Sequence, residues 1–201
     1  MAKANWLKVD PSQSSGNATV KVSSTAEHTG RKARTTTLTW TAANVQDVTR
    51  NVSQAGKPEH VSIAESASAD KAGKLVTISG ISNSTKLTFS LGSGNLTNIT
   101  LPSTYTANSI STNNGADISG DPGAAAEYNF SIAITVPANN DIAEKTRQII
   151  VTNEAGDTAI CNLRSAAGDA FVTVQEGTIE LDYLGTAVSW LVESNTTWTI
   201  S

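Results

Sequence analysis

The chain has 201 residues, a formal net charge of −4 and only 16% charged residues, with hydrophobic residues scattered among many Thr, Ser, Asn and Gly. This length allows one or two domains with a real core. The slight acidity argues against nucleic acid as a partner, since phosphate binding needs a concentrated basic face. No stretch approaches the roughly 20 apolar residues of a membrane-spanning helix, so no membrane partner is expected.

The first residues contain no apolar run of the kind found in a secretory signal. Cys161 is the single cysteine, so the chain has no intrachain disulfide framework. Both features predict a protein made in a reducing cytoplasm.

Apolar residues alternate with polar ones in several short segments. Val20 and Val22 share one face of such a segment, and Leu38 and Trp40 share one face of the next. Turn-forming runs such as residues 15–17, 93–95 and 155–157 separate these segments. Short alternating strands between turns predict an all-β chain built as an antiparallel, immunoglobulin-like β-sandwich.

The chain also repeats itself with a period of about 111 residues. Residues 51–63 align without a gap on residues 162–174, and 87–90 align on 198–201. Upstream, Val20–Val22 lies over Ile132–Ile134, and Leu38–Trp40 lies over Ile149–Val151, with a two-residue insertion when Arg34 is placed over Arg147. Ordered matches over most of the chain predict two related domains.

The repeat divides the chain into three parts. Residues 62–174 form a complete sandwich, in which 104–127 is poor in periodicity and is predicted to be a long loop. Residues 1–61 form a sandwich that lacks its first strands, and residues 175–201 supply only the first strands of another. The two incomplete pieces together add up to one domain.

We therefore expect the last strands to complete the first domain, because an open sandwich exposes apolar core and unpaired edges. The predicted donor residues are Val188, Trp190, Val192, Trp198 and Ile200, and the predicted acceptor core is Trp6, Val9, Val20, Val22, Leu38 and Trp40. The donor comes from another copy of the protein or from the same chain. Another copy is preferred because little spare linker precedes the donor strands, and such head-to-tail contacts form rings or filaments.

The N-terminal segment resembles the BACON family, immunoglobulin-like modules of Bacteroides proteins and of the phages that infect these bacteria. The resemblance rests on Trp6–Pro11, Ser14–Val20, Arg34, Val52–Gly56 and Asn195–Ser201. The central domain departs from the family pattern, with Leu87 in place of the first Trp and Ser165 in place of Gln54.

With no export signal, the chain is also similar to structural proteins of crAss-like phages, especially auxiliary proteins that decorate the capsid. This resemblance implies a virion protein made in the host cytoplasm, with the major capsid protein or other virion proteins as partners. A tail or head-fibre component is the alternative, although the chain lacks the heptads of a coiled coil.

Residues that carry chemistry are sparse. His28 and His60 have no Cys or His at metal-ligand spacing, and the carboxylates of Asp117 and Asp121 fit turns as well as a calcium loop. Cys161 lies in an alternating segment and is interpreted as a small core residue. The sequence predicts no metal, no cofactor and no enzymatic activity.

Binding of host glycans is the rival function, because BACON modules are often attached to glycan-degrading enzymes. A glycan platform needs exposed aromatic rings, whereas Trp40, Trp190 and Trp198 are in phase with aliphatic neighbours and are assigned to the core. Tyr105 and Tyr128, at the borders of the predicted loop, remain as candidates for glycan contact.

Overall fold

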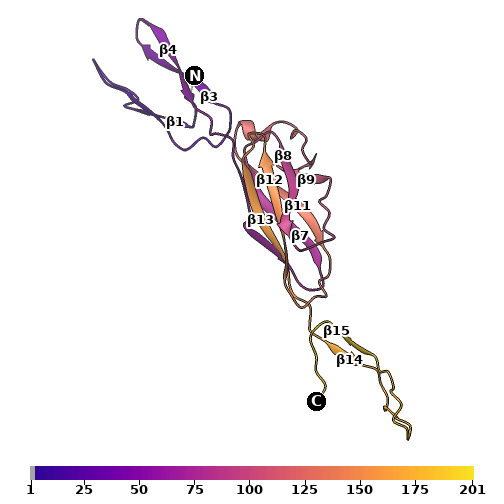
Figure 1. Ribbon diagram of the computed structural model, residues 1–201. Coiled ribbons are helices and arrows are strands. Elements are labelled where there is room, and N and C mark those ends of the chain that lie inside the picture. Colours follow the sequence, from indigo (N-terminus) through magenta and orange to yellow (C-terminus); the bar gives the residue numbers. More distant parts are fainter. Residues whose placement is uncertain (1–2) are drawn as a thin grey trace.

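A computed structural model describes residues 3–201, and within them the chain is all-β, as predicted, apart from one short 3-10 helix. Figure 1 shows a central two-sheet sandwich with separate pairs of strands at its two ends. Among these residues, no helix is long and apolar enough to cross a membrane. The elements are β1 (Leu7–Asp10), β2 (Lys21–Ser24), β3 (Arg34–Ala42), β4 (Val45–Gln54), β5 (Val61–Ile63), β6 (Ser66–Ala69), β7 (Lys74–Ser82), β8 (Leu87–Gly94), β9 (Thr104–Ala107), β10 (Ile110–Asn113), η1 (Pro122–Ala124), β11 (Tyr128–Val136), β12 (Lys145–Asn153), β13 (Thr158–Ser165), β14 (Val172–Val174) and β15 (Val192–Ser194).

The central sandwich packs a five-stranded sheet, in the order β10-β9-β11-β7-β5, against a four-stranded sheet, in the order β6-β13-β12-β8. Most of its strands alternate between buried and more exposed residues: Ile132 and Ile134 on β11 face the core, as do Ile149 and Val151 on β12. Period-two alternation of this kind is what places one face of each sheet against the other.

The segment 104–127, predicted to be a long loop, instead contains the hairpin β9–β10, which joins the sheet beside β11. Asn108 and Ser109 turn the hairpin with φ of 48° and 65°, the left-handed pair required by a tight two-residue turn. The hairpin escaped prediction because small or polar residues, Ala107 and Thr112, occupy buried positions where a large apolar residue would reveal the alternation.

The N-terminal residues form two separate two-stranded sheets, β1–β2 and β3–β4. In the β3–β4 sheet Arg34 lies opposite Gln54, and in the central sandwich Lys145 lies opposite Ser165. Lys145 follows Arg34 by 111 positions, and Ser165 follows Gln54 by the same number. The two-residue insertion predicted by placing Arg34 over Arg147 is therefore wrong. Arg147 lies instead at a β-bulge, where the register of β12 against β8 shifts.

The C-terminal strands repeat the start of the central sandwich. Val172 on β14 lies opposite Ser194 on β15, as Val61 on β5 lies opposite Ser82 on β7. β14 therefore begins a second unit rather than ending the central one. The predicted start of the central domain, residue 62, falls inside β5. The predicted end, residue 174, wrongly includes β14 in the central domain.

Candidate self-association site

The N-terminal strands leave a groove between β1 and β3. It has a volume of about 510 Å³ and its apolar lining includes Val9, Leu38 and Trp40. The structure thus brings together three of the six predicted acceptor residues. Trp6 does not line the groove: the guanidinium carbon of Arg34 lies 4.6 Å from the centroid of its ring. We call the groove, with the free edges of β2, β3 and β4, the acceptor.

Strand edges in the acceptor are open. In the part of the chain that the structure describes, β2 pairs only with β1, and β3 and β4 pair only with each other. Val22 and Trp40 are exposed at these edges, Trp40 by 42%. Unpaired strand edges that carry apolar side chains are a template for adding further strands.

Residues 175–201, which we call the donor segment, are equally open. Val188, Trp198 and Ile200 are exposed, Ile200 by 84%, while Trp190 and Val192 are half-buried. The indole Nε1 of Trp190 donates a hydrogen bond to the carbonyl oxygen of Gln175 at 2.7 Å. Apart from this local contact, the predicted donor side chains lie outside any core of their own.

The central sandwich shows where such residues are buried. By the register of β14–β15, Val188 and Trp190 correspond to Val76 and Ile78 on β7, both in the central core. By the sequence repeat, Trp198 and Ile200 correspond to Leu87 and Phe89 on β8, also core residues.

The same holds on the acceptor side. Val22 corresponds to Ile134 on β11, and Trp40 corresponds to Val151 on β12, both with no exposed surface. Exposed apolar residues at both ends of the chain therefore occupy positions that the complete sandwich buries.

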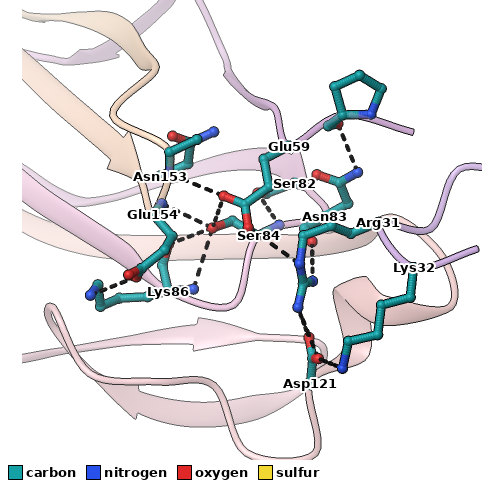
Figure 2. Close-up of polar contacts among 12 residues, drawn as sticks. Arg31, Lys32, Glu59, Ser82, Asn83, Ser84, Lys86, Asp121, Asn153 and Glu154 are labelled. Carbon is teal, nitrogen blue, oxygen red and sulfur yellow. Dashed lines mark hydrogen bonds and ion pairs between the residues drawn. The ribbon is translucent and has the colours of Figure 1, made fainter. Parts of the chain in front are cut away.

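Asn83 joins the N-terminal segment to the central sandwich (Figure 2). It is fully buried, and its Nδ2 lies 3.3, 3.3 and 3.1 Å from the carbonyl oxygens of Thr29, Lys57 and Pro58. Its Oδ1 accepts a hydrogen bond from the backbone N–H of His60 at 3.0 Å. One side chain thus holds two stretches of the N-terminal segment at the end of β7. We call this set of hydrogen bonds the first joint.

Asn195 forms an equivalent joint at the other end of the sandwich. Its Nδ2 donates to the carbonyl oxygens of Asn140 at 3.1 Å and Asp169 at 2.9 Å, and its Oδ1 accepts from the N–H of Phe171 at 3.0 Å. These three partners lie 111 positions after Thr29, Pro58 and His60. The connection between the central sandwich and the donor segment therefore has the same hydrogen bonds as the connection between the N-terminal segment and the central sandwich.

Charged residues reinforce the first joint. Arg31 donates to Asp121 at 2.9 Å and lies 3.3 Å from Glu59, and Lys32 also reaches Asp121 at 3.0 Å, as Figure 2 shows. Burial disfavours the charged carboxylate, but the hydrogen bonds and charges of Lys32 and Arg31 outweigh it and lower the pKa of Asp121. Of the two carboxylates considered for a calcium loop, that of Asp121 is thus paired with the side chains of Arg31 and Lys32, and Asp117 is exposed.

Tyr105 and Tyr128, predicted to be exposed glycan contacts, are instead buried, with 3% and 4% of their surface exposed. The hydroxyl of Tyr128 donates to the carbonyl oxygen of Ser84 at 2.9 Å, and that of Tyr105 accepts from the N–H of Leu87 at 3.3 Å. Burial raises the pKa of both phenols. The prediction failed because both tyrosines belong to strands of the central sheet rather than to a loop.

Other residues considered for chemistry have structural contacts. Cys161 is fully buried among core residues, as interpreted from its strand, and burial raises the pKa of its thiol. His28 is buried with Nε2 2.7 Å from the carbonyl oxygen of Lys32, and His60 Nε2 lies 2.9 Å from Glu127. Within residues 3–201, no three His, Cys, Asp or Glu side chains are grouped so as to hold a metal ion.

Sequence reasoning did not assign a role to Asn83 or Asn195. Their signal was the equal spacing of ten residues from Gly73 to Asn83 and from Gly185 to Asn195. That spacing marked the repeat, but a single buried amide gives no pattern of its own in a chain rich in asparagine.

No protein-family model matches this chain, and no curated protein shows significant similarity to it.

Proposed function

We propose that this is a non-enzymatic structural protein whose copies join head to tail. The donor segment of one copy adds its strands to the acceptor of the next and completes a second sandwich. The observation that carries the proposal is the correspondence between exposed and buried positions: Trp198, Ile200, Val22 and Trp40 are exposed, whereas their counterparts in the central sandwich are buried.

Burial supplies the driving force. Removing Val188, Trp198 and Ile200 from water contributes about 1.5–3 kcal/mol for each side chain. Backbone hydrogen bonds along the free strand edges add affinity and orientation. The loss of conformational freedom in the donor segment opposes both terms.

The geometry favours a neighbouring copy over the same chain as the source of the donor. Figure 1 shows β1–β4 at one end of the central sandwich and β14–β15 at the opposite end. A contact between two different surfaces of identical copies propagates until it closes as a ring or extends as a filament.

An array of this kind suits a virion shell. Together with the resemblance of residues 1–61 and 194–201 to BACON modules of crAss-like phages, it supports an auxiliary capsid protein. Its partners are then other copies of itself and the major capsid protein. The burial of Tyr105 and Tyr128 removes both residues on which the glycan-binding alternative rested.

Two complementary variants test the assembly. Trp40→Asp places a charge in the acceptor and leaves the donor intact, whereas Ile200→Asp does the reverse. We expect each variant to be monomeric alone, and an equimolar mixture to give a dimer of twice the 20.9 kDa of one chain. Thr35→Asp and Thr199→Asp are the matched controls. Thr35 is exposed on the face of β3 opposite to Trp40 and does not line the groove, and Thr199 corresponds to the exposed Thr88 of β8.

The proposal is overturned when either variant still assembles alone, or when the mixture stays monomeric although both chains remain folded. Assembly of both threonine controls would establish that added charge as such has no effect.

A further inference from the structure

Two exposed apolar residues of the donor segment have no part in the contacts described so far. Ile179 and Leu181 are 54% and 61% exposed and precede a turn at Asp182–Gly185. In this turn the N–H of Gly185 donates to the carbonyl oxygen of Asp182 at 3.0 Å, and the N–H of Leu184 donates to Oδ1 of Asp182 at 3.0 Å.

The central sandwich contains the same turn at Asp70–Gly73. The N–H of Gly73 donates to the carbonyl oxygen of Asp70 at 3.0 Å, and the N–H of Ala72 donates to its Oδ1 at 3.1 Å. Gly73 and Gly185 both have a φ of 74°. The two turns are therefore equivalent, and Ile179 and Leu181 correspond to Ala67 and Ala69 on β6.

β6 belongs to the other sheet from β7. It pairs in parallel with β13, with Ala67 opposite Leu163 and Ala69 opposite Ser165. The counterpart of β13 in the N-terminal segment is β4, because the β3–β4 and β12–β13 hairpins share one register. Within residues 3–201, β4 pairs with β3 alone, so the edge that β6 would take is free.

On the basis of the proposed function, we propose that the donor segment supplies a third strand, Ile179–Leu181, which pairs in parallel with β4 of the neighbouring copy. Ile179 then lies opposite Val52, and Leu181 lies opposite Gln54. In the other sheet, β15 and the residues before it extend along β2, with Val188 opposite Val22, as Val76 lies opposite Ile134 on β7 and β11. The joint between copies therefore spans both sheets of the completed sandwich.

The sizes of the paired side chains fit this arrangement. Ile179 is larger than Ala67, whereas its partner Val52 is smaller than Leu163. An exchange of volume between opposite positions keeps a core filled without strain. Isoleucine at the donor position thus matches a valine, rather than a leucine, on β4.

Disulfide trapping tests the third strand in the full-length chain. The double variant Val52→Cys/Ile179→Cys places two thiols opposite each other, at the spacing of adjacent strands that a disulfide bridges. After oxidation with glutathione disulfide, we expect a ladder of covalent multimers on a non-reducing gel. Cys161 is fully buried and does not compete.

Two further variants make the result specific. Val52→Cys/Thr178→Cys shifts the donor by one residue, which turns the thiol to the other face of the strand, and should give no ladder. Val22→Cys/Val188→Cys reports pairing in the other sheet and should give a ladder of its own. Light scattering under reducing conditions first establishes whether each variant assembles.

Each outcome separates the two proposals. A ladder from Val22→Cys/Val188→Cys without one from Val52→Cys/Ile179→Cys overturns the third strand and leaves the head-to-tail assembly standing. Equal ladders from the Ile179 and Thr178 variants overturn the register. A cross-linked monomer overturns pairing with a neighbouring copy, and chains that are monomeric and form no ladder overturn both proposals.

Discussion

Asn83 and Asn195 make the same hydrogen bonds at opposite ends of the central sandwich. The amide of Asn83 accepts from the N–H of His60, just before β5, and donates to the carbonyl oxygen of Pro58. The amide of Asn195 accepts from the N–H of Phe171, just before β14, and donates to the carbonyl oxygen of Asp169. Ser82 and Ser194, one residue earlier, also match, since each hydroxyl donates to the carbonyl oxygen of His60 or Phe171. Successive units along the chain are thus connected by one repeated joint.

Asn83→Asp should weaken the first joint. The carboxylate keeps an acceptor for the N–H of His60 but places an oxygen, in place of Nδ2, against the carbonyl oxygens of Thr29, Lys57 and Pro58. Losing buried donors in this way costs about 1–3 kcal/mol. Urea unfolding should show a lower midpoint than for Asn129→Asp, an exposed change on β11, and equal midpoints would contradict this role.

Trp198→Ala should weaken self-association without unfolding the chain, because this side chain is 44% exposed in the single copy. The loss of about 1.5–3 kcal/mol of burial corresponds to roughly a 10- to 100-fold weaker contact. Sedimentation velocity over a range of concentrations measures the change. Tyr183→Ala, which removes an exposed aromatic from the turn before β15, should have no effect.

Tyr128→Ala should destabilise the central sandwich. It removes a buried ring together with a hydrogen bond to the carbonyl oxygen of Ser84, and large aromatic deletions in a core cost about 3–5 kcal/mol. Thermal unfolding followed by circular dichroism checks this. A variant with unchanged melting temperature but reduced retention by mucin would instead reinstate the glycan-contact prediction.

Acid should loosen the first joint through Asp121. Its pKa is lowered in the folded chain, so the stability it contributes is full above the ordinary value of 3.8 and is lost as the pH falls through the lower, folded value. Hydrogen exchange of the Arg31 and Lys32 amides, which donate to Gly123 and Ala124 at 2.8 and 3.0 Å, reports the joint directly. These amides should exchange with less protection below pH 4.

Asp121→Asn is the control for this pH dependence. It should expose the same two amides already at pH 6 and flatten their response to acid. An unchanged pH profile in the variant would assign the effect to another group.

The sequence predicted the features that depend on alternation and repetition. The all-β fold and the core position of Cys161 follow from period-two patterns, and the shared register of the β3–β4 and β12–β13 hairpins follows the 111-residue offset. Such patterns are visible without coordinates because each face of a strand has its own solvent environment.

The features that the sequence missed depend on single residues in polar surroundings. The β9–β10 hairpin buries Ala107 and Thr112, which resemble loop residues, and this hid the burial of the neighbouring Tyr105. The role of Asn83 arises only when three carbonyl groups from distant stretches converge on one amide. Convergence of this kind is a property of the fold and leaves no local motif.

The most direct measurement is the mass of the full-length chain in solution, by light scattering after size exclusion, over a wide range of concentrations. Head-to-tail strand addition predicts rings or a distribution of polymers at multiples of 20.9 kDa that grows with concentration. A single species of 20.9 kDa at every concentration would contradict it.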